Sequence, residues 1–393
     1  MGYFSDRASS RKTHYLLGLL ALLLSTVLVA LARRYALLLV ARFLQGSSSA
    51  IVWTVGTAVL ADTFPTEQLG VAMGTIGSVV SLAMVAGPVF GGAIFHRFGY
   101  SAVFWGLGGL LVFDVVLRLL MIELKDAKKW GVDLQGQESQ ESAEATPNET
   151  TQLLDGSASK EPATSLLKVF TVYLACEKTD LCQSARFLNA CWMAFVVSVV
   201  FSGPIDAVLP LHLKETFDFN ALTSGAAFIA LALPEVVLGP VSGLIVDRYG
   251  PRLAALIGYI TLCPSLFLFI LPTGPASPSQ IALLIAVLTF NGCSTAMIGG
   301  PAMAEITLQL RTGKGDVAGM GYAQGYGLFN LAWSMGTLGG PLIAGWMMER
   351  WGWDVLCIVL GIVAGGTVIP AYLFTGGKDK EEKSDLDGSN DTR

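Results

Sequence analysis

Long apolar runs with few charged residues dominate this sequence and limit the folds that it can adopt. A helix needs roughly 20 apolar residues to cross a bilayer. Ten such runs lie at about 15–32, 36–61, 70–94, 101–122, 187–211, 222–246, 253–271, 280–303, 318–346 and 354–374. A water-soluble domain could not bury the apolar surface of a chain that is 53% hydrophobic and 14% charged. The runs do not alternate as membrane strands do, so the sequence predicts an all-α membrane protein.

The polar segments between the runs divide the chain into four regions. We expect a four-span bundle at 1–123, a cytosolic linker at 124–185, a six-span bundle at 186–375 and a cytosolic tail at 376–393. The linker and the tail are polar and highly charged, which predicts disorder. Most of the 25 lysines and arginines fall on the side that holds the linker, so both termini are predicted to be cytosolic.

A short pattern in the linker bears on which membrane holds the protein. The stretch from Glu149 to Leu154 has the acidic-dileucine form used in sorting to vacuoles and endosomes. Such patterns also arise by chance in linkers rich in glutamate. The expected location is therefore the plasma membrane or a vacuolar or endosomal membrane.

One helical pattern occurs twice, once in each predicted bundle. Pro88 and Pro341 each have a glycine four residues later, an arginine nine later, a glycine eleven later and an aromatic residue twelve later. The two copies contain Gly87, Pro88, Gly91 and Gly92, and Gly340, Pro341 and Gly345. Proline removes a backbone hydrogen bond, and closely spaced glycines let helices approach each other. We interpret the copies as helices that bend or rock and seal a central cavity against leak.

A second pattern recurs in the predicted cytosolic turns. Its copies are Gly2, Asp6, Arg7 and Arg11, and Gly243, Asp247, Arg248 and Arg252. A glycine at a helix end permits close helix contact, and the aspartate can accept hydrogen bonds from the free N–H groups that open the next helix. Two interpretations stay open: a charged inner turn that follows the orientation rule, or a paired gate.

These motifs resemble those of the major facilitator superfamily, in the drug:proton antiporter branch that includes vesicular amine transporters. The turn at 2–12 resembles the signature between spans two and three, and the stretch from Arg42 to Gly46 resembles the Arg-x-x-Gln-Gly signature of span four. The segment around Gly87 and Pro88 resembles the antiporter signature of span five. The resemblance covers essentially all helical regions and implies two pseudo-symmetric bundles.

The chain departs from the family pattern at its start. The signature turn follows span two in the family, whereas here it lies at residues 2–12. The resemblance therefore implies about ten spans in place of twelve. Two explanations stay open: a gene model that is short at its 5′ end, which we favour, or a truncated protein.

Two acidic residues within the predicted spans are candidates for proton or substrate handling. An ionisable group at the bilayer centre costs at least about 2.5–3.5 kcal/mol. Glu235 follows Pro234 in mid-span, and it is interpreted either as a proton carrier or as a protonated structural acid. Asp206 lies between Pro204 and Pro210 on a helix that we expect to be broken. It either attracts a cation or a proton, or lies exposed near the outer mouth.

Three further polar residues complete the candidate set, namely Arg42, Asp114 and Asn330. Arg42 resembles a family arginine linked to proton coupling, with snorkelling to the interface as the alternative. Asp114 and Arg118 are one helical turn apart and are expected to pair with each other. Asn330 stands where vesicular amine transporters have an aspartate, which weakens the assignment of a monoamine substrate.

The predicted function is secondary active transport, in which a small organic compound is exchanged for protons by alternating access. One interpretation is that this compound is a cation. The expected partners are this compound, protons and the lipid bilayer, with no nucleic acid, no metal and no cofactor besides the proton gradient. The protein is expected to be a monomer and not an enzyme. No GxxxxGK[ST] phosphate-binding loop occurs, which argues against ATP-driven transport. The alternatives are a facilitator or symporter on the same scaffold, or a truncated membrane protein that transports nothing.

Overall fold

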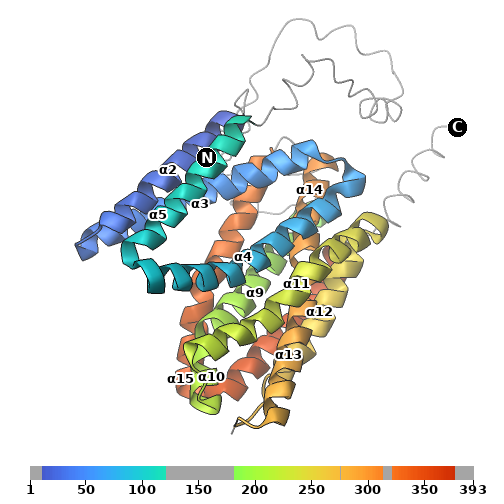
Figure 1. Cartoon of the computed structure of the whole chain (residues 1–393). Coiled ribbons are helices and arrows are strands. Elements are labelled where there is room, and N and C mark those ends of the chain that lie inside the picture. The colour runs from blue at the N-terminus through green and yellow to red at the C-terminus, as the bar shows by residue number, and fades with distance from the viewer. Residues whose placement is uncertain (1–10, 121–180, 275, 313–320, 377–393) are drawn as a thin grey trace, which may run out of the picture.

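The computed structural model describes residues 11–120, 181–274, 276–312 and 321–376, and nearly all of them are helical (Figure 1). The first half contains α2 (Arg11–Leu31), α3 (Tyr35–Thr63), the 3₁₀ helix η1 (Thr66–Gln68), α4 (Leu69–Phe98) and α5 (Tyr100–Leu120). No strand occurs in these described ranges. The all-α prediction is therefore confirmed.

The second half begins with α9 (Leu181–Val200), before the predicted boundary at 186. It continues through the π-helix η3 (Phe201–Val208), α10 (Leu209–Phe217), α11 (Ala221–Tyr249), α12 (Pro251–Leu268), α13 (Pro278–Ala296), α14 (Gly299–Thr312) and α15 (Tyr322–Phe374). Two helices meet within α15 at Gly352, whose backbone is not helical. The ten predicted spans are helical where the structure describes them, apart from turns at 269–271 and 297–298 and single residues at 32 and 321.

Several predicted features lie outside the described residues. They are Gly2, Asp6, Arg7, the linker as far as residue 180 with its acidic-dileucine stretch, and the tail from residue 377. Arg11 begins α2, but its side chain is not among those described, and the same holds for Pro88 in α4. The roles given to these residues stay predictions.

The two copies of the Gly-Pro pattern end in the same turn. Gly99 and Gly352 have φ angles of 81° and 82°. A residue with a Cβ atom is strained in this part of backbone space, whereas glycine is not. The glycine that follows each proline by eleven residues is therefore required by the turn that separates two helices.

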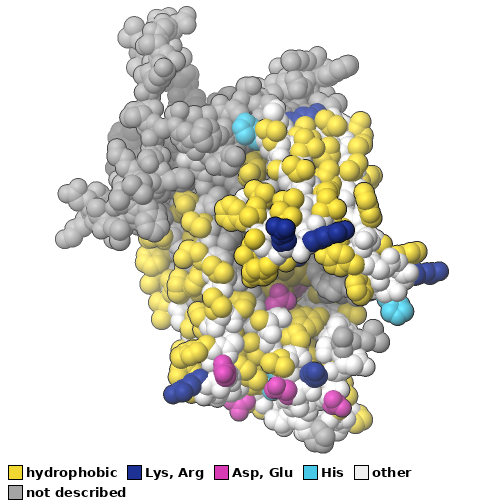
Figure 2. Space-filling model, turned by 90° about the vertical axis from the view of Figure 1, so that its left-hand side faces the viewer, with side chains coloured by type: hydrophobic (Ala, Val, Ile, Leu, Met, Phe, Trp, Pro, Cys, Tyr) yellow, Lys and Arg dark blue, Asp and Glu magenta, His cyan; other side chains and the backbone are white. Residues whose placement is uncertain are grey.

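The outer surface of the helices is apolar. Figure 2 shows a face that is largely covered by hydrophobic side chains, with several charged groups toward its lower edge and a few, mainly basic, across its middle. Leu24, Trp105 and Leu338 expose 72%, 80% and 72% of their surfaces. Eight helical stretches of the described residues are long and apolar enough to cross a bilayer, when α9 to α10 count as one stretch, α13 with α14 as another, and the two-helix α15 as a third. The protein is a multi-pass membrane protein whose apolar exterior suits lipid.

A buried ion pair fixes one end of the second half. Glu305 of α14 is fully buried, and its Oε1 lies 2.9 Å from Nε of Arg186 on α9. The backbone N–H of Gly376, just beyond α15, donates to Oε2 of the same carboxylate at 3.2 Å. Three segments far apart in the sequence therefore meet at Glu305.

Glu305→Ala is expected to lower the stability of the protein strongly. Removing one partner of a buried pair leaves the other charge uncompensated, which costs about 3–5 kcal/mol. The measurement is the melting temperature of the purified protein in detergent. Glu349→Ala, at an exposed position of α15, serves as the control. Equal melting temperatures of the two variants would contradict this role of Glu305.

Candidate functional site

The most extensive helix–helix contact in the described structure joins α4 of the first half to α11 of the second. Glycines let the two backbones touch. A Cβ atom on Gly74 would lie 2.2 Å from the carbonyl oxygen of Gly239, and one on Gly243 would lie 2.3 Å from that of Gly70. We call this the α4–α11 contact, and Gly243 has the role of close helix approach that the sequence predicts.

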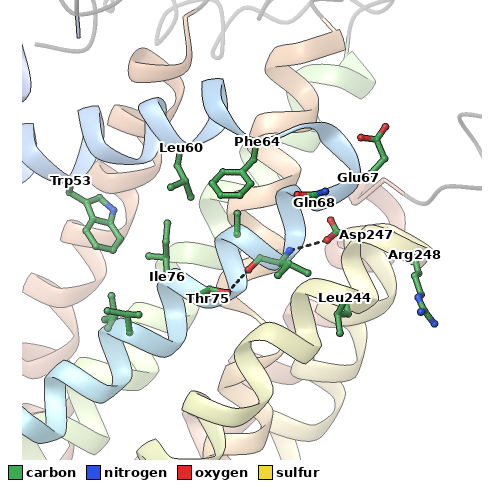
Figure 3. A pocket seen from close by; sticks show the side chains of 14 residues that line it. Trp53, Leu60, Phe64, Glu67, Gln68, Thr75, Ile76, Leu244, Asp247 and Arg248 are labelled. Carbon is green, nitrogen blue, oxygen red and sulfur yellow. Dashed lines mark hydrogen bonds between the residues drawn. The ribbon is translucent and has the colours of Figure 1, made fainter. Parts of the chain in front are cut away.

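Asp247 closes one end of the α4–α11 contact. Its Oδ1 accepts a hydrogen bond from the N–H of Gly70 at 2.6 Å, and its Oδ2 accepts one from the N–H of Val71 at 3.0 Å (Figure 3). Free N–H groups at a helix start favour a negative charge. We refer to this side of the molecule as the Asp247 end.

The predicted partner of Asp247 was wrong. The aspartate caps α4 from the other half of the chain, and not α12, which follows it in sequence. At the start of α12, Pro251 has no N–H to donate, and the N–H of Arg252 donates to the carbonyl oxygen of Gly376 at 3.2 Å. Arg252 is also engaged elsewhere, because its Nε donates to the carbonyl oxygen of Thr375 at 3.0 Å, while Arg248 is exposed.

Asp247→Ala is expected to loosen the α4–α11 contact at this end. Loss of a helix cap costs about 0.5–2 kcal/mol. A cysteine at Val246, which is buried and packs against Gly70, reports opening through its rate of reaction with a small thiol reagent. The assay uses a chain whose six native cysteines are replaced. The cysteine should react faster in Asp247→Ala than in the neighbouring control Arg248→Ala, and equal rates would rule out the cap.

A central cavity of about 700 Å³ lies between the two halves. It is lined by Ser81, Met84, Phe201, Asp206, Pro210, Lys214, Phe219, Asn220, Ser224, Gly225, Phe228, Leu231, Ala232 and Glu235. Along α11 it runs from Glu235 to Asn220 at the helix start, which is the end opposite Asp247. A smaller space of about 100 Å³ continues from Glu235 toward Gly74 and Trp333. The cavity therefore lies on the far side of the closed contact.

Glu235 is the point where the cavity meets the closed contact. Its carboxyl group accepts hydrogen bonds from the hydroxyl groups of Ser81 on α4 and Thr295 on α13. Its backbone carbonyl oxygen accepts one from Ser78 at 3.2 Å. Both carboxyl oxygens thus have a partner, and one of these partners comes from the other half of the protein.

Asp206 lines the same cavity, but its helix is not broken. Residues Phe201–Val208 form a π-helix that continues through Pro204, with the N–H of Leu209 bonded to the carbonyl oxygen of Pro204. The wider π turn accommodates the residue that lacks an N–H, and such turns are frequent at functional sites. Asp206 is exposed, and Lys214 of α10 shares the cavity with it.

The other sequence candidates lie away from this cavity. Arg42 is exposed and donates a hydrogen bond to Oε1 of Gln45 at 3.0 Å. Arg118 is buried with its guanidinium group 4.6 Å from the ring centroid of Tyr15, and its pairing with Asp114 stays a prediction. Asn330 is half-buried on α15 and is not among the residues that line the central cavity.

The glycines of the Gly-Pro pattern differ in their surroundings. A Cβ atom on Gly340 would lie 2.6 Å from the hydroxyl oxygen of Ser202, so α15 approaches the η3 segment closely. No described atom lies within 4 Å of a Cβ atom placed on Gly87, Gly91, Gly92 or Gly345. Of these five glycines, Gly340 in the second copy is the one that lies at a close helix contact in the described structure.

A second hollow, of about 730 Å³, lies beside Asp247 between α3, α4 and α11. Its walls are mostly apolar, as Trp53, Leu60 and Ile76 show in Figure 3. Asp247 is held there by the cap of α4, whereas the central cavity contains Glu235 and Asp206. We assign the candidate site to the central cavity for this reason.

The hydroxyl groups that hold Glu235 were missed by the sequence analysis. Serine and threonine in helices commonly bond to a carbonyl of their own preceding turn, and Ser81 and Thr295 also do so. Such residues are frequent in the spans, so no signal sets these two apart. Among the described residues, no group of three or more His, Cys, Asp or Glu side chains could hold a metal ion.

Residues 1–323 match the sequence profile of the Major Facilitator Superfamily. The MFS-type transporter ppzB of Metarhizium majus is 32% identical over 399 residues, 95% of this chain and 86% of that one. The bovine synaptic vesicular amine transporter is 24% identical over 88% of this chain and 57% of its own. The crystal structure of the human organic anion transporter MFSD10 has the same fold, with a TM-score of 0.67 and 18% identity over 95% of this chain and 79% of that one.

Proposed function

Because this chain belongs to the major facilitator superfamily, whose members are membrane transporters and not enzymes, we propose that it exchanges a small organic compound for protons by alternating access. One observation carries the proposal. The central cavity contains Glu235 and Asp206 and is closed at the Asp247 end by the α4–α11 contact. A site that is closed toward one end and extends toward the other is what alternating access requires.

Glu235 is the proposed proton site. It is half-buried among apolar helices, has hydroxyl partners on both carboxyl oxygens, and lines the cavity through which a proton arrives. A carboxyl group in such a place changes its charge when the cavity is exposed to solvents of different pH. Uptake on one side of the membrane and release on the other couples proton flow to the movement of the two halves.

The cavity suits an organic compound of modest size. Ligand sites commonly measure about 300–1,000 Å³ with mainly apolar walls and a few polar groups. Phe201, Phe219 and Phe228 supply apolar surface, and the charged residues of the lining are two acids and one lysine. This balance favours a neutral or cationic compound. The relatives named above include an amine transporter and an organic anion transporter, so a screen includes both charges.

The membrane and the topology complete the proposal. Lysines and arginines fall mostly on the Asp247 side of the spans, so we place this end and both termini in the cytosol. The central cavity then extends toward the outer or luminal side. The plasma membrane and a vacuolar or endosomal membrane both fit this arrangement, and the proposed acting unit is a monomer.

The test is transport by the purified chain in lipid vesicles with an imposed pH gradient. Ethidium and rhodamine 6G serve as organic cations and carboxyfluorescein as an organic anion. Proton antiport predicts that at least one probe accumulates in acid-interior vesicles and that a protonophore abolishes this accumulation. Accumulation only when the exterior is acidic would indicate a symporter. Movement that ignores the gradient would indicate a facilitator, and no movement of any probe would contradict the proposal.

A further inference from the structure

The α4–α11 contact reaches from the Asp247 end to the central cavity. It begins at the cap formed by Asp247 and continues through Gly70 against Gly243 and Gly74 against Gly239. Ser78, one turn further along α4, donates its hydroxyl hydrogen to the carbonyl oxygen of Glu235 at 3.2 Å. The final contact is the hydrogen bond from Ser81 to the Glu235 carboxyl group. Of the contacts in this series, only the last one contains an ionisable side chain that lines the cavity, and that side chain is Glu235.

We propose that Ser81 and Thr295 are positioning residues that make the α4–α11 contact sensitive to a proton on Glu235. The inference rests on the proposed function, because it assumes that Glu235 exchanges protons during transport. Ser81 belongs to the first half of the protein, whereas Thr295 and Glu235 belong to the second. One hydroxyl group therefore bonds across the two halves, and the other orients the acid within its own half.

The physical basis is the difference between charged and neutral hydrogen bonds. A carboxylate accepts both hydroxyl hydrogens, and bonds to an ionised acceptor are roughly twice as strong as neutral ones. When Glu235 binds a proton, the bond from Ser81 loses this charge assistance. The α4–α11 contact then weakens at the point nearest the cavity. A proton that arrives through the cavity thereby favours opening of the Asp247 end.

Few charged groups near Glu235 compete with this effect. Asp206 of η3 and Lys214 of α10 share the central cavity with it. Around Glu235 itself, the described lining residues from the other elements carry no charge. They are Gly74, Gly77, Val80, Ser81 and Met84 of α4, Val197 of α9, Phe201 of η3, Thr295 and Ala296 of α13, Gly299 and Gly300 of α14, and Trp333 of α15. The two hydroxyl groups are therefore the polar side chains that bond directly to the acid.

The pH dependence of vesicle transport tests the positioning role. Ser81→Ala and Thr295→Val each remove one hydrogen bond donated to the carboxylate. Each is expected to move the midpoint pH of proton-driven transport upward by about one unit. Thr295→Ser keeps the hydroxyl group and should restore the midpoint. Ser78→Ala is the matched control, because its hydroxyl bonds only backbone carbonyl oxygens and its midpoint should not move.

Labelling of a chain with the substitution Val246→Cys distinguishes the role of the Ser81 hydroxyl group from that of the Thr295 hydroxyl group. In the parent chain, the rate at which this cysteine reacts with a thiol reagent, divided by the rate of a free model thiol at the same pH to remove the change in thiolate fraction, should increase as the pH falls through the transport midpoint. Ser81→Ala should react about ten-fold faster than the parent at high pH and show a much smaller change of this rate with pH. Thr295→Val should keep a pH dependence, displaced with its transport midpoint, because Thr295 makes no bond across the halves.

Two outcomes contradict different statements. If Glu235→Gln ends proton-driven transport but Ser81→Ala keeps the midpoint and labelling of the parent chain, the positioning role is wrong and the proposed function stands. If Glu235→Gln still transports against a pH gradient, Glu235 is not the proton site. A Ser81→Ala protein that inserts, melts like the parent chain and labels with unchanged pH dependence would overturn the inference.

Discussion

Glu235→Gln is expected to reduce proton-driven transport to the level of vesicles without protein. Glutamine keeps the size of the side chain and still accepts a hydrogen bond from Ser81 or Thr295, the two partners of the acid. It cannot bind or release a proton at neutral pH. The loss should therefore appear in accumulation against a gradient, and not in membrane insertion or melting temperature.

Exchange of labelled for unlabelled probe without a pH gradient is the control for this variant. If Glu235 carries the proton, Glu235→Gln should retain such exchange, since the cavity and its walls are unchanged. Asp206→Asn should also abolish proton-driven flux if the second cavity acid takes part in coupling. Undiminished accumulation by both variants would remove the two acids from the coupling mechanism.

Gly74→Ala is expected to lower transport by more than about ten-fold. A Cβ atom at this position would lie 2.2 Å from the carbonyl oxygen of Gly239 and 3.2 Å from the backbone nitrogen of Gly243. Backbone atoms cannot move aside as the end of a flexible side chain can, and overpacking of this kind costs about 1–3 kcal/mol. The Asp247 end can then no longer close. The measurement is the initial rate of probe accumulation at equal protein content.

Gly77→Ala provides a matched control on the same helix. Apart from its chain neighbours and the backbone of its own helix turn, no described atom lies within 4 Å of a Cβ atom placed on Gly77, so this variant should transport within about two-fold of the parent chain. Alanine also favours helix over glycine by about 1 kcal/mol, which makes a loss of stability unexpected. Equal transport by the two alanine variants would show that the α4–α11 contact tolerates separation.

Helices were predictable from the sequence because each lies in a long apolar run, and the turns at Gly99 and Gly352 were marked by the repeat. The partner of Asp247 was not. A turn motif shows only neighbours along the chain, whereas the N–H of Gly70 that bonds to Asp247 lies 177 residues away. Contacts between the halves depend on how the helices cross, which one sequence does not contain.

The acids of the site were found for a physical reason, and their surroundings were not. Glu235 and Asp206 stood out because charged groups are costly within apolar spans. Their meeting in one cavity depends on α11 and η3 lying on facing sides of it. The continuity of the helix through Pro204 was missed because a proline was taken as a break, whereas a π turn accommodates it.

The most direct test of alternating access is a pair of distances between spin labels in the reconstituted protein. One pair, at Glu67 of η1 and Leu253 of α12, spans the two halves near the Asp247 end, and the other, at Ser101 of α5 and Glu215 of α10, spans them at the opposite end. All four positions are exposed. Lowering the pH through the transport midpoint should lengthen the first distance and shorten the second. Two distances that stay fixed, or that change in the same direction, would contradict alternating access through the cavity at Glu235.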